Sequence, residues 1–344
     1  MKILVGLSGG VDSTYAAKLL KDAGHDVTGA AVLMHSFTDV SAAERAASEI
    51  GIKFEIIDAR RLFDEVVVKN FTDEYLAGRT PNPCCLCNPA VKFASLCDFA
   101  SRNVYDRVAT GHYAGIGYED GRYFIRCGAD PRKDQSYMLW GLTQEQLRML
   151  IFPLADLTKN GIKKNAEELG VSAAFKRESQ EICFIPDGDY AAFVMNRSWR
   201  VPEPGFFIDG DGHVLGRHSG IVNYTVGQRK GLGISLGAPM FVSEIRSDDN
   251  TVVLVPSGKE YFSSCRLGKI NYMKLSPGTE NVSGMIRIRY SKSITDATAV
   301  FGENGCTIFF SQPCRAVTPG QSGVFYYGDD ILFGGIIESA ERIK

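Results

Sequence analysis

KILVGLSGGVDSTYAAKLLKDAG, residues 2–24, is the stretch of sequence that decides the fold of the first part of this chain. Its first six residues are an apolar run of strand length, and residues 12–23 carry apolar side chains at helical spacing before a closing glycine. Between them, the two glycines of SGGVDS (8–13) let the backbone turn its N–H groups toward an anion, and the following helix adds its positive end. A strand, a glycine loop and a helix in this order predict an α/β domain that binds phosphate in its first loop.

Strands and helices continue to alternate after this loop. The predicted strands lie at residues 26–34, 53–59 and 107–113. A helix is predicted at residues 41–51, with Ser41 as its N-cap and Gly51 closing it. Alternation of this kind is typical of a doubly wound parallel sheet that helices cover on both faces. The sequence therefore predicts an α/β fold for the N-terminal part.

The alternation fades near residue 195, where glycine, proline and short β-branched runs become frequent. The predicted strands of this region lie at residues 220–225, 238–245, 251–256, 284–290, 296–302, 306–311 and 322–328. Many short strands between turn residues favour small β-barrels. We therefore predict an α/β catalytic domain at 1–197, a central β-rich domain at 198–260 and a C-terminal β-barrel domain at 261–344.

The composition is that of an ordinary globular protein, with 44% hydrophobic and 23% charged residues among 344. No apolar run approaches the ~18 residues of a membrane span, and the nine cysteines are too scattered for a secreted disulfide scaffold, so we expect a cytoplasmic protein with no membrane partner. A net charge of −2 excludes a globally basic nucleic-acid binder. The basic segments at 197–200, 227–231 and 286–292 are either solvated surface or a local face for phosphates.

The residues of SGGVDS suit a nucleotide. Asp12 is a candidate ligand for Mg²⁺, and the hydroxyls of Ser8 and Ser13 are candidate donors to phosphate oxygens. The alternative is a plain Gly-Gly turn. The loop is not the GxxxxGK[ST] motif, but it resembles the PP-loop of the ATP pyrophosphatase superfamily. This resemblance implies cleavage of ATP between the α- and β-phosphates, adenylation of a carbonyl oxygen, and an adenine at the carboxyl edge of the sheet, near Val32 and Gly111.

Cysteines are concentrated in the segment TPNPCCLCN (80–88), which holds Cys84, Cys85 and Cys87. We expect Pro81 and Pro83 to keep this segment out of a helix. A further cysteine, Cys183, lies in SQEICFIPDGDY (179–190). One alternative is a structural zinc site, but the sequence lacks the second CxxC or HxxxH pair that such a site usually needs. Inert buried thiols are a further alternative. The clustering favours reactive thiols or a metal-cluster site.

Seven motifs together carry a closer resemblance. They are SGGVDS (8–13), GRTPNP (78–83) followed by CN, ATGHY (109–113), KDQSY (133–137), SQEICFIPDGDY (179–190), TVGQRKGLGI (225–234) and AVTPGQ (316–321). In this order they resemble the bacterial tRNA-specific 2-thiouridylase family, over a span from Ile3 to about Ile337. The first motif is shared with other PP-loop families, whereas the later ones are more specific.

This resemblance implies a reaction. The substrate is the wobble uridine of the Lys, Glu and Gln tRNAs, whose ring-2 oxygen attacks the α-phosphate of ATP. A persulfide sulfur then displaces AMP. By position in the motifs, Cys183 matches the persulfide-bearing cysteine and Cys87 the nucleophile that forms a disulfide with it on product release. A sulfur donor protein, a cysteine desulfurase or a sulfur relay, is implied as a partner. Because thiolates are the reactive form, we expect an electropositive site.

The same resemblance implies contact residues. The ATP contacts are Gly6, Leu7, Ser8, Gly9, Gly10, Val11, Asp12, Ser13, Val32 and Gly111. The contacts to the target base are Asn82, Pro83 and Cys84. The other tRNA contacts are His112, Lys133, Asp134, Gln135, Arg289, Tyr290 and Gln321. For the KDQSY segment the alternative is a polar loop, and for Arg289 and Tyr290 it is an ordinary strand.

The sequence departs from the family pattern at three places. Many members have Asp where this chain has Cys84, and Met where it has Val32. The segment before residues 41–51 is also shorter than usual. Cys84, Cys87 and Cys183 together are enough thiolates to hold a 4Fe–4S cluster with one open iron that binds sulfide. The sulfur carrier is thus either a persulfide on Cys183 or a cluster.

Two other classes of function stay open on sequence alone. One is a PP-loop ligase or amidotransferase that acts on a small molecule, similar to argininosuccinate or GMP synthetases. Such an enzyme has no need for Cys87 and Cys183. The other is a non-catalytic tRNA-binding or iron–sulfur sensing module. Such a module has no need for an intact SGGVDS loop.

Overall fold

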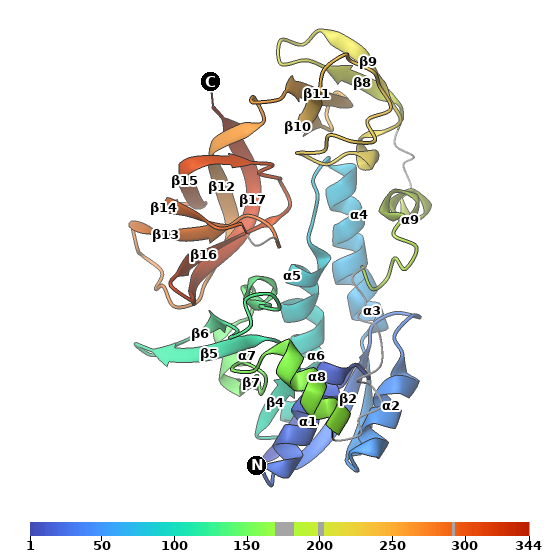
Figure 1. The fold of residues 1–344 in the computed structure, drawn as a ribbon, viewed down its shortest axis with the longest axis vertical. Helices are drawn as coiled ribbons and strands as arrows, with labels where there is room; N and C mark the ends of the chain where they lie inside the picture. The colour runs from blue at the N-terminus through green and yellow to red at the C-terminus, as the bar shows by residue number, and fades with distance from the viewer. Residues whose placement is uncertain (169–181, 199–202, 291–292, 344) are drawn as a thin grey trace. The chain divides into compact units, whose positions relative to one another are not determined.

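The computed structural model describes residues 1–168, 182–198, 203–290 and 293–343 (Figure 1). The chain divides into two compact units, each assembled from three stretches. Unit 1 comprises Met1–Val67, Cys84–Pro186 and Asp329–Leu332. Unit 2 comprises Val68–Pro83, Asp187–Gly328 and Phe333–Lys344. The three domains expected from the sequence stay a prediction.

Unit 1 is built on a parallel sheet. Its strands are β1 (Lys2–Gly6), β2 (Asp26–Leu33), β3 (Lys53–Asp58), β4 (Arg107–Thr110) and β7 (Leu150–Ile151), in the order β3-β2-β1-β4-β7. Every neighbouring pair in this sheet is parallel. The predicted α/β class and parallel sheet are confirmed, and the strands of residues 26–34 and 53–59 end within one residue of their predicted bounds.

Unit 1 also contains helices and short helical turns. They are α1 (Val11–Asp22), α2 (Val40–Glu49), α3 (Arg60–Phe63), α5 (Pro83–Cys87), α6 (Ala94–Arg102), α7 (Gln144–Met149) and α8 (Lys159–Glu168), with a π turn η2 (Asn88–Phe93), a 3-10 turn η3 (Ser136–Leu139) and the π turn η1 (Asp64–Val68). Apolar side chains of α1 and α2 form one core with β1 and β2, in which Ile3, Val5, Ala17 and Ala43 are buried. Burial of this apolar surface is the main force that fixes the sheet against these helices.

Two local predictions in unit 1 are wrong. Helix α2 is capped by Asp39, whose side chain accepts from the Ala42 amide, because this carboxylate reaches the free N–H groups before Ser41 can. Pro83 does not exclude a helix but begins α5, since the first helical residue needs no hydrogen-bonded N–H. Cys84, Cys85 and Cys87 therefore lie on a helix rather than in an extended loop.

Unit 1 also holds an antiparallel hairpin, β5 (Ala114–Glu119) and β6 (Arg122–Cys127), that sequence reasoning missed. The free edge of β6 pairs with Asp330, at the start of β17 (Asp330–Arg342). The Arg126 side chain donates to the Asp330 carboxylate at 3.0 Å. The last stretch of unit 1 thus covers a strand edge.

Unit 2 is rich in β-structure. Strands β8 (Gly205–Ile208), β9 (Val214–His218), β10 (Met240–Arg246) and β11 (Thr251–Pro256) form a sheet in the order β10-β11-β8-β9. A barrel follows, made of β12 (Tyr261–Tyr272), β15 (Gly305–Arg315), β14 (Thr295–Gly302), β13 (Asn281–Arg287), β16 (Ser322–Tyr327) and β17, and closed by the pairing of β12 with β17. The predicted β-rich central region and C-terminal barrel are confirmed.

One predicted strand of unit 2 is absent. Residues 220–225 include the 3-10 turn η5 (Ile221–Asn223) rather than a strand. Ile221 is buried in the core that Phe207 and Val252 share, so the apolar pattern reflects burial without a ladder. The helices of this unit, α4 (Lys69–Leu76) and α9 (Tyr190–Arg197), meet through stacked rings of Tyr75 and Tyr190, 4.9 Å apart. Across the described ranges, every helix is too short or too polar to cross a bilayer.

Candidate functional site

The glycine loop between β1 and α1 is shaped by close packing. Gly9 has φ +71°, and a Cβ there would lie 2.5 Å from the Ala42 Cβ. Gly111, which follows β4, approaches the first turn of α1 so closely that its Cβ would lie 2.6 Å from the Ser13 nitrogen. Both positions therefore require glycine, and they bring the backbone amides of the loop and of the first turn of α1 to one edge of the sheet.

Serine hydroxyl groups make hydrogen bonds within this loop. Ser13 Oγ donates to the Gly10 carbonyl oxygen at 3.1 Å and accepts from the Ser8 amide at 3.1 Å. The two serine hydroxyls lie 3.1 Å apart. Val32, 8% exposed, lies near the carboxyl end of the neighbouring strand β2. The residues predicted to contact ATP, from Gly6 to Ser13 with Val32 and Gly111, thus gather at the carboxyl ends of β1, β2 and β4.

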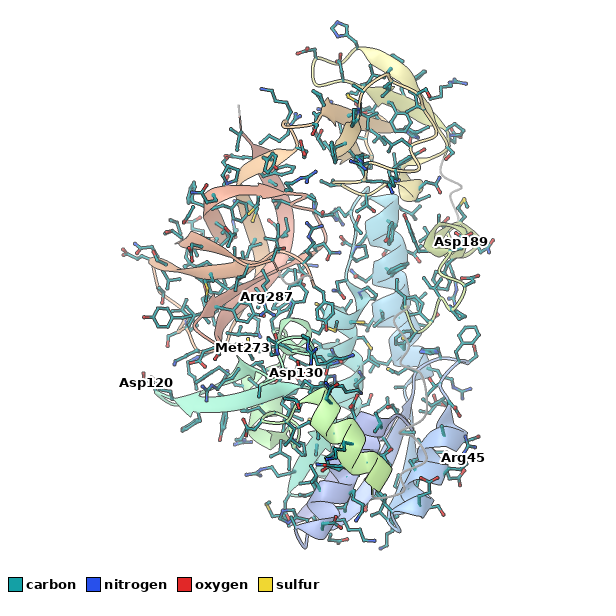
Figure 2. The ribbon with its side chains drawn as sticks, viewed as in Figure 1. Arg45, Asp120, Asp130, Asp189, Met273 and Arg287 are labelled. Carbon is teal, nitrogen blue, oxygen red and sulfur yellow. The ribbon has the colours of Figure 1, made fainter. Side chains whose placement is uncertain are left out.

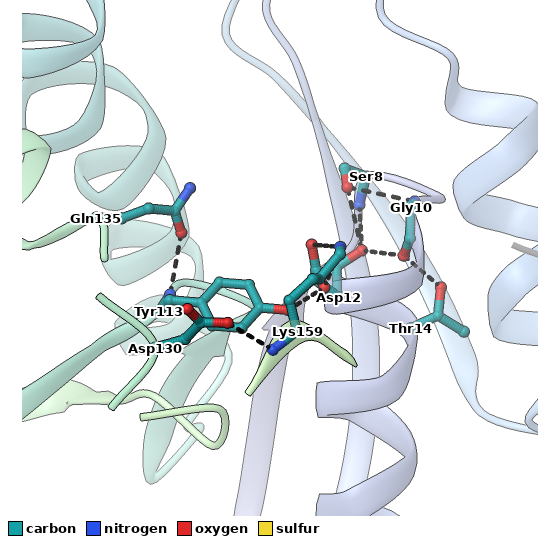
Figure 3. Close-up of polar contacts among 9 residues, drawn as sticks. Ser8, Gly10, Asp12, Thr14, Tyr113, Asp130, Gln135 and Lys159 are labelled. Atoms are coloured by element: carbon teal, nitrogen blue, oxygen red, sulfur yellow. Dashed lines mark hydrogen bonds and ion pairs between the residues drawn. The ribbon is translucent and has the colours of Figure 1, made fainter. Parts of the chain in front are cut away.

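Asp12 is held by two side chains that sequence reasoning missed. Lys159, the first residue of α8, places its Nζ 2.8 Å from both carboxylate oxygens of Asp12. The Tyr113 hydroxyl donates to Oδ1 at 2.5 Å. Figure 3 shows both side chains converging on Asp12. The signal available in the sequence was only a lysine more than a hundred residues away from Asp12.

A loop beside Tyr113 extends this network. Asp130, labelled in Figure 2, is 3% exposed and accepts from the Lys159 amide at 3.1 Å. Gln135 exchanges hydrogen bonds with the Tyr113 backbone: its side-chain oxygen accepts at 3.0 Å and its amide donates at 2.9 Å. The loop therefore positions Tyr113 and Lys159 against Asp12.

The KDQSY segment is ordered by its own carboxylate. Asp134 is 7% exposed and accepts from the Gly128 amide and from both the amide and the hydroxyl of Ser136. The Lys133 amide donates to the Asp130 carbonyl oxygen. Asp134 and Gln135 thus shape the loop, and the contacts of Lys133, Asp134 and Gln135 with tRNA stay predictions.

Three thiols lie within electrostatic range of one another in unit 1. Cys84 and Cys183 are exposed, and Cys87 is 8% exposed. Each of the three interacts electrostatically with the other two. The fold thus brings the α5 segment and the residues after 182 together, although about a hundred residues separate them in sequence. All nine cysteines carry free thiols, so the disulfide expected in the reaction cycle is not present here. Residues 179–181 of the SQEICFIPDGDY motif lie outside the described ranges.

Desolvation by the surrounding protein raises the pKa of all three thiols, even though Cys84 and Cys183 keep exposed surface, and it raises the pKa of Cys87 to about 12. The nearby Lys92 ammonium lowers each pKa, but by less than burial raises it. Cys87 Sγ also lies 3.6 Å from the Met34 sulfur, a soft and apolar neighbour. A cation of the kind expected for an electropositive site is therefore present, but desolvation outweighs its effect on the pKa of the thiols in this arrangement.

Lys92 was not singled out from the sequence. Its Nζ donates to Asn88 Oδ1 at 3.0 Å, and Asn88, 3% exposed, donates to the Met138 carbonyl oxygen at 3.2 Å. The backbone of Lys92 also makes a hydrogen bond to the Cys87 sulfur. Both residues of this contact lie at the π turn η2, which sequence reasoning missed.

His112 lies beside this cluster as a neutral imidazole. Burial, and then Lys92, hold its pKa well below the usual range. Its Nδ1 is 2.7 Å from the Thr110 hydroxyl, and its ring lies between Phe93 and Phe152 at centroid distances of 5.4 and 5.9 Å. A neutral ring in this position suits a base or a ribose better than a phosphate.

The remaining predicted tRNA contacts belong to unit 2. Asn82 and Pro83 are partly exposed, and Arg289 and Tyr290 are exposed. Gln321 is engaged within the unit: its side-chain amide donates to the Thr80 carbonyl oxygen at 2.7 Å. The Gln321 side chain therefore ties the GRTPNP segment to the loop before β16.

Metal-binding geometry was sought throughout the described ranges. One group of three side chains, Asp209, Asp211 and His213, has all its ligand atoms within 4.8 Å of one another, on an exposed turn of unit 2. Cys84, Cys87 and Cys183 do not form a group that tight. The thiols thus do not match a compact mononuclear site in this arrangement.

Three family models match successive parts of the chain. The one described as tRNA methyl transferase HUP domain matches residues 1–187. The one described as tRNA methyl transferase PRC-barrel domain matches residues 194–256. The one described as aminomethyltransferase beta-barrel domain matches residues 262–337.

Full-length relatives are also similar to this chain. A tRNA-specific 2-thiouridylase MnmA of Acetivibrio thermocellus is 41% identical over 355 residues, covering 98% of this chain and 99% of the relative. The protein of the same name from Clostridioides difficile is 42% identical over 98% of each chain. That from Carboxydothermus hydrogenoformans is 40% identical over 98% of this chain and 97% of its own.

Proposed function

The chain belongs to the tRNA-specific 2-thiouridylase family and is a sulfurtransferase that thiolates tRNA, and we propose that its substrate is the wobble uridine at position 34. The observation that carries the proposal is that Cys84, Cys87 and Cys183 lie within electrostatic range of one another in the unit that also holds the PP-loop. Sulfur chemistry and ATP chemistry are thereby available to one base.

The first step uses ATP. The uridine O2 attacks the α-phosphorus, the bond to the β-phosphate breaks, and pyrophosphate leaves. The amides of the Gly9 loop and the first turn of α1 are oriented to bind the phosphates. Asp12 offers the hard carboxylate oxygens that Mg²⁺ prefers, and the ion supplies charge neutralisation when it is bound. We assign this step to the residues predicted as ATP contacts.

The second step transfers sulfur. The terminal sulfur of a Cys183 persulfide attacks C2, and AMP leaves with the former O2. The Cys87 thiol loses its proton and attacks the Cys183 sulfur, so the sulfur–sulfur bond breaks, 2-thiouridine leaves and a Cys87–Cys183 disulfide forms. A cellular dithiol then reduces this disulfide. Because burial favours protonated thiols, Lys92 is the group that stabilises the developing thiolate.

A 4Fe–4S cluster is the alternative sulfur carrier. Three soft thiol donors, two of them exposed, fit a cluster with one open iron, and its role when bound is to deliver sulfide. We propose the persulfide route because Cys87 and Cys183 are sufficient for it, whereas Cys84 stands where many relatives carry Asp. Cys84 then lies near the base as a bystander.

The partners we propose are tRNAs of the Lys, Glu and Gln types and a sulfur donor protein, a cysteine desulfurase or a sulfur relay. The reaction with tRNA takes place in the cytoplasm. Asn82, Pro83 and Cys84 are proposed to contact the base. His112, Lys133, Asp134, Gln135, Arg289, Tyr290 and Gln321 are proposed to contact the rest of the tRNA.

The test is a reconstituted reaction with protein purified without oxygen. Unmodified tRNA, ATP, Mg²⁺ and a persulfide donor are supplied, and 2-thiouridine and pyrophosphate are measured. Cys87→Ser and Cys183→Ser should abolish 2-thiouridine yet still release pyrophosphate. If the wild-type protein releases pyrophosphate but makes no 2-thiouridine, the proposed reaction is wrong.

Cys84→Ser separates the two sulfur carriers. Under the persulfide route, thiolation falls modestly and the protein holds no stoichiometric iron. Under the cluster route, iron and activity disappear together in this variant. Iron and acid-labile sulfide are measured on the same preparations, so the result does not depend on turnover alone.

A further inference from the structure

The cation that faces Asp12 is a part of the protein. The side chain of Lys159 is 12% exposed and that of Asp12 is 29% exposed, and the ammonium contacts both carboxylate oxygens at 2.8 Å. The Tyr113 hydroxyl adds a hydrogen bond to Oδ1. The carboxylate best suited to Mg²⁺ is therefore already paired with a positive charge (Figure 3).

Contacts other than this ion pair also hold α8 against α1. Ile162 and Ala166 of α8 pack with Val11 and Tyr15 of α1 in a buried cluster. Asn165 of α8 donates to the Tyr15 hydroxyl at 3.0 Å. The contact between the two helices therefore includes apolar packing and a hydrogen bond in addition to the Lys159–Asp12 ion pair.

The backbone of Lys159 is anchored, and its side chain is long and flexible. The Lys159 amide donates to the buried Asp130 carboxylate. A four-carbon stem then lets the ammonium reach different acceptors around one anchor point. Phosphate oxygens bound by the loop at Gly9 would add negative charge beside Asp12. Neighbouring like charges repel strongly where water is partly excluded.

We propose that Lys159 is an ATP-binding residue that exchanges partners: it pairs with Asp12 before ATP binds, then passes to the phosphates as Mg²⁺ takes the carboxylate. The exchange keeps each anion neutralised throughout binding. It also makes the ammonium and Mg²⁺ competitors for Asp12. This inference rests on the proposed use of ATP and assigns a new residue to that site.

The exchange predicts effects of opposite sign in Lys159→Met. ATP binding without Mg²⁺, measured by calorimetry in EDTA, should weaken ~10-fold or more, the size of one charged hydrogen bond. Mn²⁺ binding without nucleotide, measured by electron paramagnetic resonance, should become tighter because the competing ammonium is gone. Lys159→Arg keeps the charge and should retain most of the ATP affinity.

Lys18→Met is the matched control. Lys18 lies on α1, pairs with Asp22 at 2.8 Å, and its replacement changes the net charge equally. Both affinities should equal those of the wild type. Lys159→Gln is a second variant without the charge. Thermal melting of both Lys159 variants shows whether a loss of binding comes from a loss of the fold.

Three outcomes in Lys159→Met overturn the exchange. Weaker binding of both ligands would show a structural role, unchanged binding of both would show no role, and weaker ATP binding with unchanged Mn²⁺ binding would reduce Lys159 to a phosphate contact. A wild-type protein that binds no ATP in the presence of Mg²⁺ would instead remove the proposed function. The two failures are therefore distinguishable.

Discussion

Cys87 combines two properties that oppose each other. Its burial raises the pKa to about 12, while Lys92 and a backbone hydrogen bond act in the opposite direction. A protonated thiol is protected from oxidation, but it must lose its proton to attack sulfur. The residue is thus kept unreactive until the reaction stabilises its anion.

The pH dependence of Cys87 alkylation follows from this pKa. Iodoacetamide reacts with the thiolate, so the rate should keep rising through pH 9, where an ordinary thiol levels off, toward the Cys87 pKa of about 12. The same shift lowers the free energy of unfolding as the pH rises from 9 to 12, because only the unfolded thiol ionises there. Peptide mass spectrometry measures the rate, and a plateau below pH 9 contradicts the assignment.

Lys92→Met should slow the alkylation of all three thiols at pH 8. The ammonium lowers the pKa of Cys84, Cys87 and Cys183, and each unit of increase in pKa reduces the thiolate fraction about tenfold. Arg102→Met is the control, since Arg102 pairs with Asp98 on the exposed face of α6. Equal rates in wild type and Lys92→Met would argue that the lysine has no influence on the thiols.

Individual residues of the site differ in how far the sequence could reveal them. Asp12 and the cysteines stand in recognisable motifs, so their importance was predictable. The fold places Lys92 and Lys159: a local π turn brings the Lys92 backbone to Cys87, and Lys159 reaches Asp12 from a helix distant in the sequence. A single lysine in a helical pattern carries no such information.

At the scale of elements, the β1–α1 junction was predictable in full and the helix after Pro83 was not. Glycines after an apolar run point to one kind of turn. A proline is compatible both with a broken segment and with the first turn of a helix, and the packing of the following helix decides between them. The hairpin of β5 and β6 was missed because its short strands carry glycine and charge.

Gly9→Ala should destabilise unit 1 by more than about 2 kcal/mol. The left-handed backbone penalises a side chain, and the new Cβ would press on Ala42. Gly10→Ala is the control, because its Cβ would meet nothing closer than the Ser8 hydroxyl at 3.4 Å. Thermal melting compares the two variants, and similar losses of stability in both would refute this account of the loop.

Gln321→Ala should loosen the GRTPNP segment. The side-chain amide donates to the Thr80 carbonyl oxygen, and one such hydrogen bond stabilises by about 1 kcal/mol. Amide exchange at residues 78–80 should accelerate about fivefold. Gln312→Ala, at an exposed position of β15, should leave exchange unchanged. If only tRNA affinity changes in Gln321→Ala, the residue is a tRNA contact without a role in holding the segment.

At the scale of the whole molecule, an acidic protein must bind an acidic substrate. The net charge is −2, so binding depends on local basic side chains rather than on the overall charge. Arg289 is exposed in unit 2 and is one such side chain. Both the β-rich character of this unit and its basic segments were visible in the sequence, whereas its assembly from three stretches was not.

Arg289→Ala should weaken tRNA binding and reduce its salt dependence. Each phosphate contact contributes roughly 0.9 to the slope of log affinity against log salt on a duplex, so the slope should fall by about that amount. Arg102→Ala, far along the sequence on α6, serves as the control. Filter binding at several salt concentrations gives the slopes, and an unchanged slope in Arg289→Ala excludes a phosphate contact there.

The discontinuous make-up of unit 1 has a consequence during protein synthesis. The partner of Arg126 on β6 is Asp330, which leaves the ribosome 204 residues later. Until then the nascent chain carries an uncovered strand edge, which is open to pairing with other chains. A protein fragment that stops at residue 197 keeps the PP-loop with Cys84, Cys87 and Cys183, but it lacks Asp330 and so the pairing at the edge of β6. We therefore expect the fragment to aggregate, and the catalytic region to depend on translation reaching the far end of the message.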